Sequence, residues 1–251
     1  VFEERFHYWA DRLGYLTWGE SASWGLVFCS WYHTMPANRH VPFEAGALNF
    51  LTEWREVITR DRNHPSIIAW SPFNETGGGY DAAFHDRILR AAYDLTRDLD
   101  PTRPVNDTSG YVHVHTDLWT VHNYEQDPEK LRTLLTPGAE GVWRNNPKRE
   151  TAYGGQPYLV DEFGGIRWTP PDKREKLVAG WGYGQEPRTL EDFYARLKGQ
   201  VDALLSLKHV AGYCYTQLTD VEQEQNGVYY YDRTRKFDMA RIARIFRRDP
   251  E

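Results

Sequence analysis

Cysteine, long apolar runs and excess basic charge are all scarce in this 251-residue sequence. The two cysteines, Cys29 and Cys214, cannot build a disulfide framework, and two thiols alone cannot hold a structural zinc. The longest apolar runs, such as SIIAW and YLV, are far too short to cross a bilayer. The net charge is −6 and no Lys/Arg-rich tract stands apart from acids, so neither nucleic acid nor a membrane is expected as a partner.

Two further absences concern cofactors and targeting. No GxGxxG or GxxxxGK[ST] motif follows an expected strand, and nothing else indicates a cofactor or a resident metal, so none is expected. The N-terminal VFEERFHYWADRLG has none of the layout of a signal peptide, and the compartment stays open between cytoplasmic and secreted.

Aromatic residues, in contrast, are abundant. The sequence has 10 Trp, 16 Tyr and 11 Phe, together 15% of its residues. Their flat faces pack well in a core, and the same faces suit the C–H surface of a sugar ring. Most of these rings are expected in the core, and a few at a carbohydrate site.

Short β-rich runs alternate with segments of helical period along the whole chain. Helices are predicted over residues 1–14, 47–60, 82–99, 190–207 and 239–248, and strands over 15–20, 67–75, 105–110, 118–124, 157–165 and 210–220. This alternation predicts an α/β fold with parallel strands. A (β/α)8 TIM barrel is favoured over a doubly wound sheet, because polar residues gather at the C-terminal ends of several strands without a phosphate-binding turn.

Two glutamates at strand ends carry the chemical prediction. Glu75 ends the run IIAWSPFNE, and Glu162 lies in PYLVDEFGG, and neither has a basic residue close by in sequence. A pair of carboxylates that flank one bond is the usual equipment of glycoside hydrolases. The remaining candidate residues, also near strand ends, are Asn74, His122, Tyr124, Trp18, Glu20, Gln217 and Asp220.

Three segments, RDRNHPSIIAWSPFNE, PYLVDEFGG and GYCYTQLTDVEQEQNGVYYYDRTRK, resemble the catalytic barrel of the family 2 glycoside hydrolases, which include β-galactosidases, β-glucuronidases and β-mannosidases. The resemblance implies that Glu75 is the acid/base and Glu162 the nucleophile of a retaining, double-displacement reaction on β-glycosides. A neutral β-galactoside is the expected substrate, because an Asn-x-Lys element of β-glucuronidases is not evident after the last strand. The alternative is a carbohydrate-binding or pseudoenzyme module that hydrolyses nothing.

The smaller roles are predicted with their structural alternatives beside them. Asn74 is expected to donate to the sugar 2-hydroxyl or to form a turn, and Tyr124 to hydrogen-bond Glu162. His122 is expected to contact a sugar hydroxyl or to lie in the core, and Trp18 and Glu20 to face the barrel mouth, with Trp18 equally suited to the core. Asp220 is expected at the mouth or in a solvated loop. His113 and His115 share an expected strand face and with Asp117 mimic the spacing of a metal site, but spacing alone does not predict one and no metal is expected there.

The expected strand at residues 15–20 corresponds to the third of the eight strands in the family. Residues 1–251 are therefore predicted to be one partial catalytic barrel domain, with the first two strands and the β-sandwich domains of the family belonging to a longer protein. A barrel that lacks two strands exposes sheet edges, so the activity of this chain alone is an open question.

Overall fold

The elements of the chain fall into two compact units. The computed structural model describes residues 1–21, 23, 43–77, 81–170 and 180–249. One unit comprises Val1–Val121 with Arg144–Pro157, and the other comprises His122–Trp143 with Tyr158–Glu251. Cys29, Gly78 and Gly79 lie outside the described residues.

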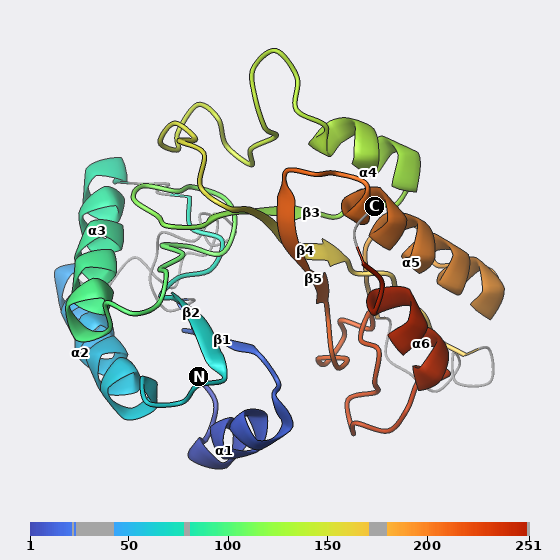
Figure 1. Cartoon of the computed structure of the whole chain (residues 1–251), viewed down its shortest axis with the longest axis horizontal. Helices are drawn as coiled ribbons and strands as arrows, with labels where there is room; N and C mark the ends of the chain where they lie inside the picture. Colours follow the sequence, from blue (N-terminus) through green and yellow to red (C-terminus); the bar gives the residue numbers. More distant parts are fainter. Residues whose placement is uncertain (22, 24–42, 78–80, 171–179, 250–251) are drawn as a thin grey trace. The chain divides into compact units, whose positions relative to one another are not determined.

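The first unit contains a parallel strand pair and three helices. Strands β1 (Thr17–Glu20) and β2 (Ile67–Ser71) lie side by side, as do helices α2 (Phe43–Asp61) and α3 (Ala82–Leu99), and helix α1 (Glu4–Leu13) precedes β1 (Figure 1). The pairing register sets Glu20 opposite Ser71. Because the strands are parallel, their carboxyl ends lie at the same edge of the pair.

Two buried tryptophans join the helices and the strands of the first unit. The Trp54 indole of α2 donates to Thr96 Oγ1 of α3 at 2.8 Å, and the Trp70 indole of β2 donates to Asp100 Oδ2 at 2.8 Å. The two rings meet edge to face, with centroids 5.8 Å apart. Both polar indole groups are thus satisfied in a core that also buries Phe50.

Local signals set the helix ends. Helix α1 stops at Gly14, whose φ of 67° lies in the left-handed region that glycine adopts without strain. Helix α3 begins after Asp81, which accepts a hydrogen bond from the Phe84 amide, and it ends one residue before Asp100, which precedes Pro101.

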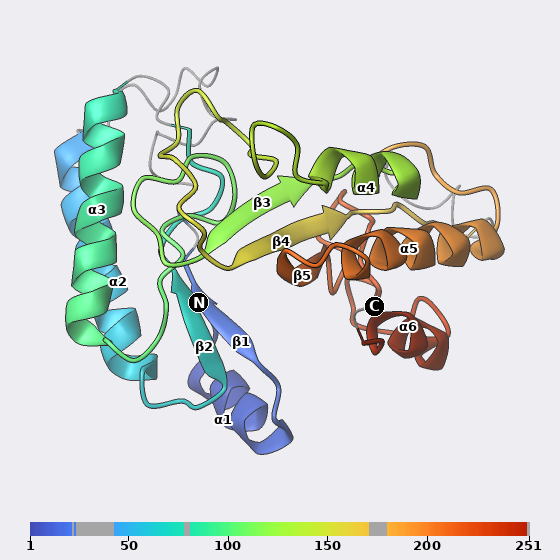
Figure 2. The ribbon, with the colours of Figure 1, turned by 45° about the horizontal axis from the view of Figure 1, so that its top comes forward.

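The second unit is organised around the sheet β3-β4-β5, whose first strand begins in the preceding unit. Strands β3 (Trp119–Asn123) and β4 (Tyr158–Gly164) lie side by side, with α4 (Pro128–Leu135) and α5 (Leu190–Leu205) beside them (Figure 2). Strand β5 (Val210–Thr216) runs parallel to β4, with Gly164 opposite Thr216. Helix α6 (Met239–Phe246) follows, and α5 starts with a Thr189–Asp192 capping box.

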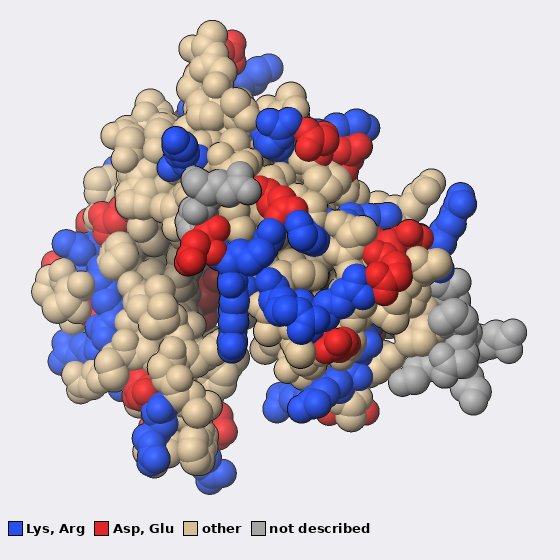
Figure 3. Space-filling view, turned by 45° about the vertical axis from the view of Figure 1, so that its right-hand side comes forward, with Lys and Arg blue, Asp and Glu red and all other residues tan. Residues whose placement is uncertain are grey.

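Basic and acidic side chains are interspersed on the face shown in Figure 3. Within the second unit, Arg241 of α6 pairs with Glu191 of α5 at 2.6 Å, and Arg248, just after α6, pairs with Asp202 of α5. The Arg241 guanidinium also lies 3.8 Å from the centre of the Tyr194 ring. The charges of these pairs compensate one another locally. In the described part of the chain, no helix combines the length and the apolar character needed to cross a bilayer.

The predicted alternation of strands and helices is confirmed, and the α3 range is confirmed to the residue. Two local predictions are wrong. Residues 105–110 form two isolated parallel bridges, Trp70 to Val105 and Asn74 to Ser109, and no continuous strand. His113 and His115 lie outside any strand. Helix α4 was not predicted, although Asp127 caps it and Pro128 opens it, which are ordinary start signals.

Candidate active site

Glu75 stands just beyond β2 in a constrained backbone conformation. Its φ is 51°, which for a residue other than glycine costs about 1 kcal/mol. Its amide donates to the Ser109 carbonyl at 2.9 Å, and the neighbouring Asn74 amide donates to Ser23 Oγ at 3.1 Å. Strained backbone of this kind persists where surrounding contacts hold it, and it is enriched at functional sites. Glu75 and Asn74 are both half-buried.

Trp18 and Glu20 occupy alternate positions of β1 and are both half-buried, as their period-two spacing predicts. Trp18 is paired with Ala69, and Glu20 with Ser71, three residues before Asn74. The first unit therefore places the carboxyl end of β1 beside the start of the Asn74–Glu75 segment.

A buried polar network supports the segment that holds Glu75. Asp107 Oδ1 contacts His113 Nδ1 at 2.7 Å, and Asp107 Oδ2 accepts hydrogen bonds from the amides of Val114 and His115. The other His113 ring nitrogen lies 2.8 Å from the Thr120 carbonyl. Burial disfavours the charged imidazole, but the charge and hydrogen bond of Asp107 outweigh it and raise the pKa of His113.

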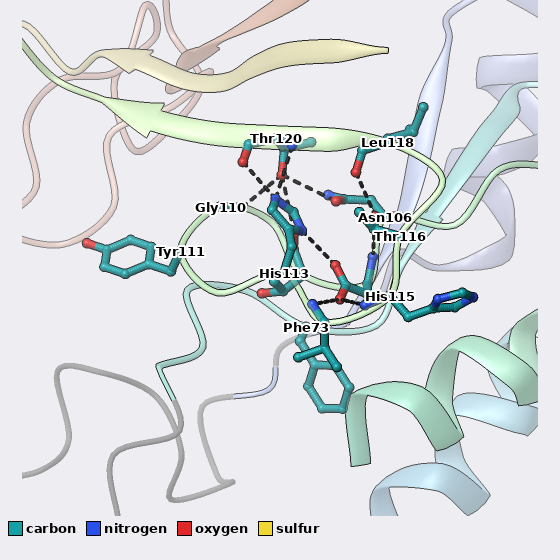
Figure 4. A network of polar contacts seen from close by, with 12 residues as sticks. Phe73, Asn106, Gly110, Tyr111, His113, His115, Thr116, Leu118 and Thr120 are labelled. Carbon is teal, nitrogen blue, oxygen red and sulfur yellow. Dashed lines mark hydrogen bonds and ion pairs between the residues drawn. The ribbon is translucent and has the colours of Figure 1, made fainter. Parts of the chain in front are cut away.

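The side chains of His113, His115 and Asp117, whose spacing mimics a metal site, do not point to a common centre. The His113 ring is directed at Thr120, whereas the His115 ring points away from it (Figure 4). His115 packs against the Tyr93 ring, with centroids 4.3 Å apart. Asp117 accepts hydrogen bonds from the Tyr93 hydroxyl at 2.7 Å and from the Val105 amide. The three side chains therefore have separate structural partners.

Glu150, which sequence reasoning passed over, belongs to the same unit. Its side chain is 1% exposed, and the nearest cation is Arg144, with Nε 3.9 Å from Oε1. Burial raises the pKa of the Glu150 carboxyl to about 7, although the charges of His113 and Arg144 oppose that rise. Its position in a loop after an arginine gave no sequence signal of burial.

Glu162 in the second unit is surrounded by polar partners. The Tyr124 hydroxyl donates to Glu162 Oε2, so the predicted hydrogen bond between these residues is present. Thr216 Oγ1, at the end of β5, lies 3.2 Å from the same hydroxyl. Burial and the negative charge of Glu162 raise the pKa of Tyr124, which keeps the phenol protonated and able to donate.

His122 bridges the two adjacent acids of β4. Its Nδ1 lies 3.3 Å from Glu162 Oε2, and its Nε2 lies 3.5 Å from Asp161 Oδ1. His122 and Asp161 are buried, whereas the Glu162 side chain is 24% exposed. The cluster thus fixes the Glu162 carboxylate while leaving part of it open, as a nucleophile requires.

Gln217 and Asp220 lie in the segment that follows β5. Gln217 Nε2 donates to Asn226 Oδ1 at 2.9 Å. Both Asp220 oxygens contact the Lys236 ammonium, at 2.8 and 3.0 Å, and the Lys236 side chain is 1% exposed. This buried ion pair connects the two ends of the segment 220–236.

Tyr183 is a second residue that sequence reasoning missed. Its ring stacks on the Tyr124 ring with centroids 3.5 Å apart and an interplanar angle of 1°. The stack holds the phenol that donates to Glu162. The only signal in the sequence was an aromatic pair set among glycines, GWGYG at residues 180–184.

The model of the domain described as "Glycosyl hydrolases family 2, TIM barrel domain" matches residues 2–167. The chain belongs to this family. It is 32% identical over 157 residues to Beta-galactosidase 2 of Enterobacter cloacae, covering 51% of this chain and 14% of that protein. It is 28% identical over 99 residues to human Beta-glucuronidase, covering 39% of this chain and 13% of that protein.

A solved structure extends the likeness to the fold of the whole chain. The beta-D-glucuronidase of Dictyoglomus thermophilum superposes with a TM-score of 0.67 at 19% identity, covering 99% of this family 2 chain and 43% of that one. The α/β barrel prediction is confirmed at the level of fold. The chain spans about one seventh of the first curated relative.

Proposed function

We propose that this family 2 chain carries the two catalytic glutamates of a retaining β-glycosidase. The observation that carries the proposal is the environment of Glu162, which Tyr124 and His122 hold in place while one quarter of its side chain stays exposed. A carboxylate that accepts hydrogen bonds and remains partly open is suited to attack an anomeric carbon. No cofactor or metal enters this reaction scheme.

In the first step Glu162 attacks the anomeric carbon and the glycosidic bond breaks. Glu75 gives its proton to the departing oxygen, so the aglycone leaves as a neutral alcohol. In the second step Glu75 removes a proton from water, and the water oxygen displaces Glu162 from the sugar. Two inversions retain the anomeric configuration, and this geometry requires the two carboxyl groups to approach within roughly 5 Å in the active protein.

The remaining candidates take supporting roles in this proposal. Asn74 contacts the sugar 2-hydroxyl, His122 orients Glu162 and reaches a sugar hydroxyl, and Trp18, Glu20 and Gln217 contact the sugar from the strand ends. Asp220, expected from the sequence at the barrel mouth or in a solvated loop, takes a structural role in the proposal because Lys236 engages both of its oxygens.

A neutral β-galactoside is the proposed substrate. Glu222 and Glu224 add negative charge to the segment after β5, and negative charge disfavours an anionic sugar. Enterobacter cloacae Beta-galactosidase 2, which shares 32% identity with this chain, carries the same substrate class in its name.

Hydrolysis of 4-nitrophenyl β-D-galactopyranoside tests the proposal. The expected result is turnover that falls by about three orders of magnitude or more in Glu162→Gln, which keeps the shape of the side chain and removes its nucleophilic charge. Glu140→Gln is the matched control, because Glu140 is an exposed glutamate of the same unit. Equal turnover in the two variants, or binding of the glycoside without turnover at any pH, would exclude the hydrolase.

A further inference from the structure

Trp181 is a large aromatic side chain held at the surface. It is 48% exposed, whereas most tryptophans in the described part of the chain are buried or half-buried. Leaving an indole in water forgoes the burial of one of the largest apolar side chains. The exposed part of the indole is available for contact with a ligand, and the surroundings of Trp181 distinguish it from other exposed apolar residues.

The backbone around Trp181 is fixed. Its amide donates to the Gln223 carbonyl at 2.7 Å, and its carbonyl accepts from the Gln225 amide at 2.9 Å. The next residue, Gly182, lies so close to Arg167 that a Cβ added to the glycine would lie 2.9 Å from the backbone nitrogen of Arg167. Hydrogen bonds from the Trp181 amide and to its carbonyl, together with this close approach, fix the backbone from which the exposed indole projects.

A chain of ring contacts leads from Trp181 to the proposed nucleophile. The Trp181 and Tyr183 rings meet edge to face, with centroids 5.8 Å apart and an interplanar angle of 76°. Tyr183 in turn stacks on Tyr124 at 3.5 Å, and the Tyr124 hydroxyl donates to Glu162. The exposed indole is thus two ring contacts away from the side chain that binds Glu162, and all of these residues belong to one unit.

We propose that Trp181 is a stacking platform for the aglycone, the ring that leaves when Glu162 attacks. The ligand class is a β-glycoside whose leaving group presents an apolar ring face, either an aromatic ring or the C–H face of a second sugar. The inference rests on the proposed function, because it names the part of the substrate that lies beyond the bond Glu162 breaks. Tyr183 supports the platform through its edge contact and is itself fixed by the Tyr124 stack.

Calorimetric binding of two non-hydrolysable probes tests the platform. The probes are 4-nitrophenyl 1-thio-β-D-galactopyranoside and methyl 1-thio-β-D-galactopyranoside, which differ only in the aglycone. The protein is expected to bind the nitrophenyl probe about tenfold more tightly than the methyl probe, in line with one aromatic stacking contact. Trp181→Ala is expected to reduce this ratio to near one without weakening the methyl probe, and Trp181→Phe to give an intermediate ratio.

Trp9→Ala is the matched control, because Trp9 is 55% exposed and lies on α1 in the other unit. It is expected to keep the tenfold ratio. The platform is excluded if Trp181→Ala keeps the ratio, if the protein itself shows none, or if it binds neither probe. If Trp181→Ala keeps the affinity ratio and Glu162→Gln abolishes hydrolysis, the platform is excluded and the hydrolase proposal stands. If the affinity ratio depends on Trp181 but the protein hydrolyses no glycoside, the stacking role of Trp181 is supported and the hydrolase proposal is excluded.

Discussion

At the residue scale, the proposed reaction depends on how Glu162 is held. Two groups contact its carboxylate, the His122 ring of β3 and the Tyr124 hydroxyl just after β3, and Thr216 of β5 contacts that hydroxyl. Hydrogen bonds to an ionised group are among the stronger polar contacts, and they also fix its direction. The neighbouring side chains therefore fix the orientation of the Glu162 carboxylate, and single substitutions can remove these contacts one at a time.

Tyr124→Phe removes the hydroxyl that donates to Glu162 and retains the ring that stacks on Tyr183. We expect turnover to fall by about 10- to 100-fold, the equivalent of one charge-assisted hydrogen bond. The acidic limb of the pH-rate profile is expected to move to higher pH, because the lost hydrogen bond favoured the ionised form. Steady-state kinetics across pH 4 to 9 measures both effects.

Tyr213→Phe is the control for this substitution, since Tyr213 also lies in the second unit and its hydroxyl makes a longer contact, 3.4 Å, to the Phe246 carbonyl. It should leave the profile in place. A Tyr124→Phe variant with the turnover and profile of the control would show that the phenol does not act on Glu162.

The two glutamates proposed as catalytic, together with Asn74 and Tyr124, could be proposed from sequence because each lies near the end of a predicted strand. The Tyr124–Glu162 hydrogen bond was predicted and is present. The Tyr183 stack was not, because it joins residues that are 59 positions apart and no local pattern specifies a ring partner. The contact between Asp107 and His113 was not predicted either, because it depends on the folded path of the loop that joins them.

At the element scale, sequence patterns predicted the regular elements and failed where side chains replace backbone partners. Residues 105–110 were expected to form a strand. Instead, the amides of Val105, Asp107 and Gly110 donate to the side-chain oxygens of Asp117, Thr116 and Thr120. Only part of the segment remains available for backbone pairing, and it forms isolated bridges to Trp70 of β2 and to Asn74 beyond it.

The loop that carries Glu150 gives a pH-dependent stability. The pKa of this carboxyl is raised from 4.5 to about 7 by burial, so its stabilising contribution is complete below about pH 4.5 and is lost as the pH rises through 7. Between pH 5 and pH 8, the unfolding free energy of the protein is expected to fall by about 1 to 3 kcal/mol relative to Glu150→Gln. Urea unfolding at both pH values measures this difference.

Glu4→Gln is the matched control, because Glu4 is exposed on α1. It is expected to follow the pH dependence of the unsubstituted protein. If Glu150→Gln follows the same dependence, Glu150 titrates at an ordinary pKa and the loop is not the source of the effect.

At the scale of the whole molecule, membership of family 2 and the parallel α/β fold are shown, and the arrangement of the reaction is proposed. Glu75 belongs to one compact unit and Glu162 to the other. The prediction that residues 1–251 act as one partial barrel domain stays a prediction. The function proposed here requires these two glutamates to serve a single sugar, with Glu162 as the residue that becomes covalently attached.

The most direct measurement is mass spectrometry of the protein after incubation with 2-deoxy-2-fluoro-β-D-galactopyranosyl fluoride. This reagent forms a glycosyl ester on the nucleophile of a retaining enzyme and slows its hydrolysis. We expect one adduct per chain, on the peptide that contains Glu162, and no adduct in Glu162→Gln. An adduct on a different carboxylate, or an adduct that persists in Glu162→Gln, would contradict this expectation.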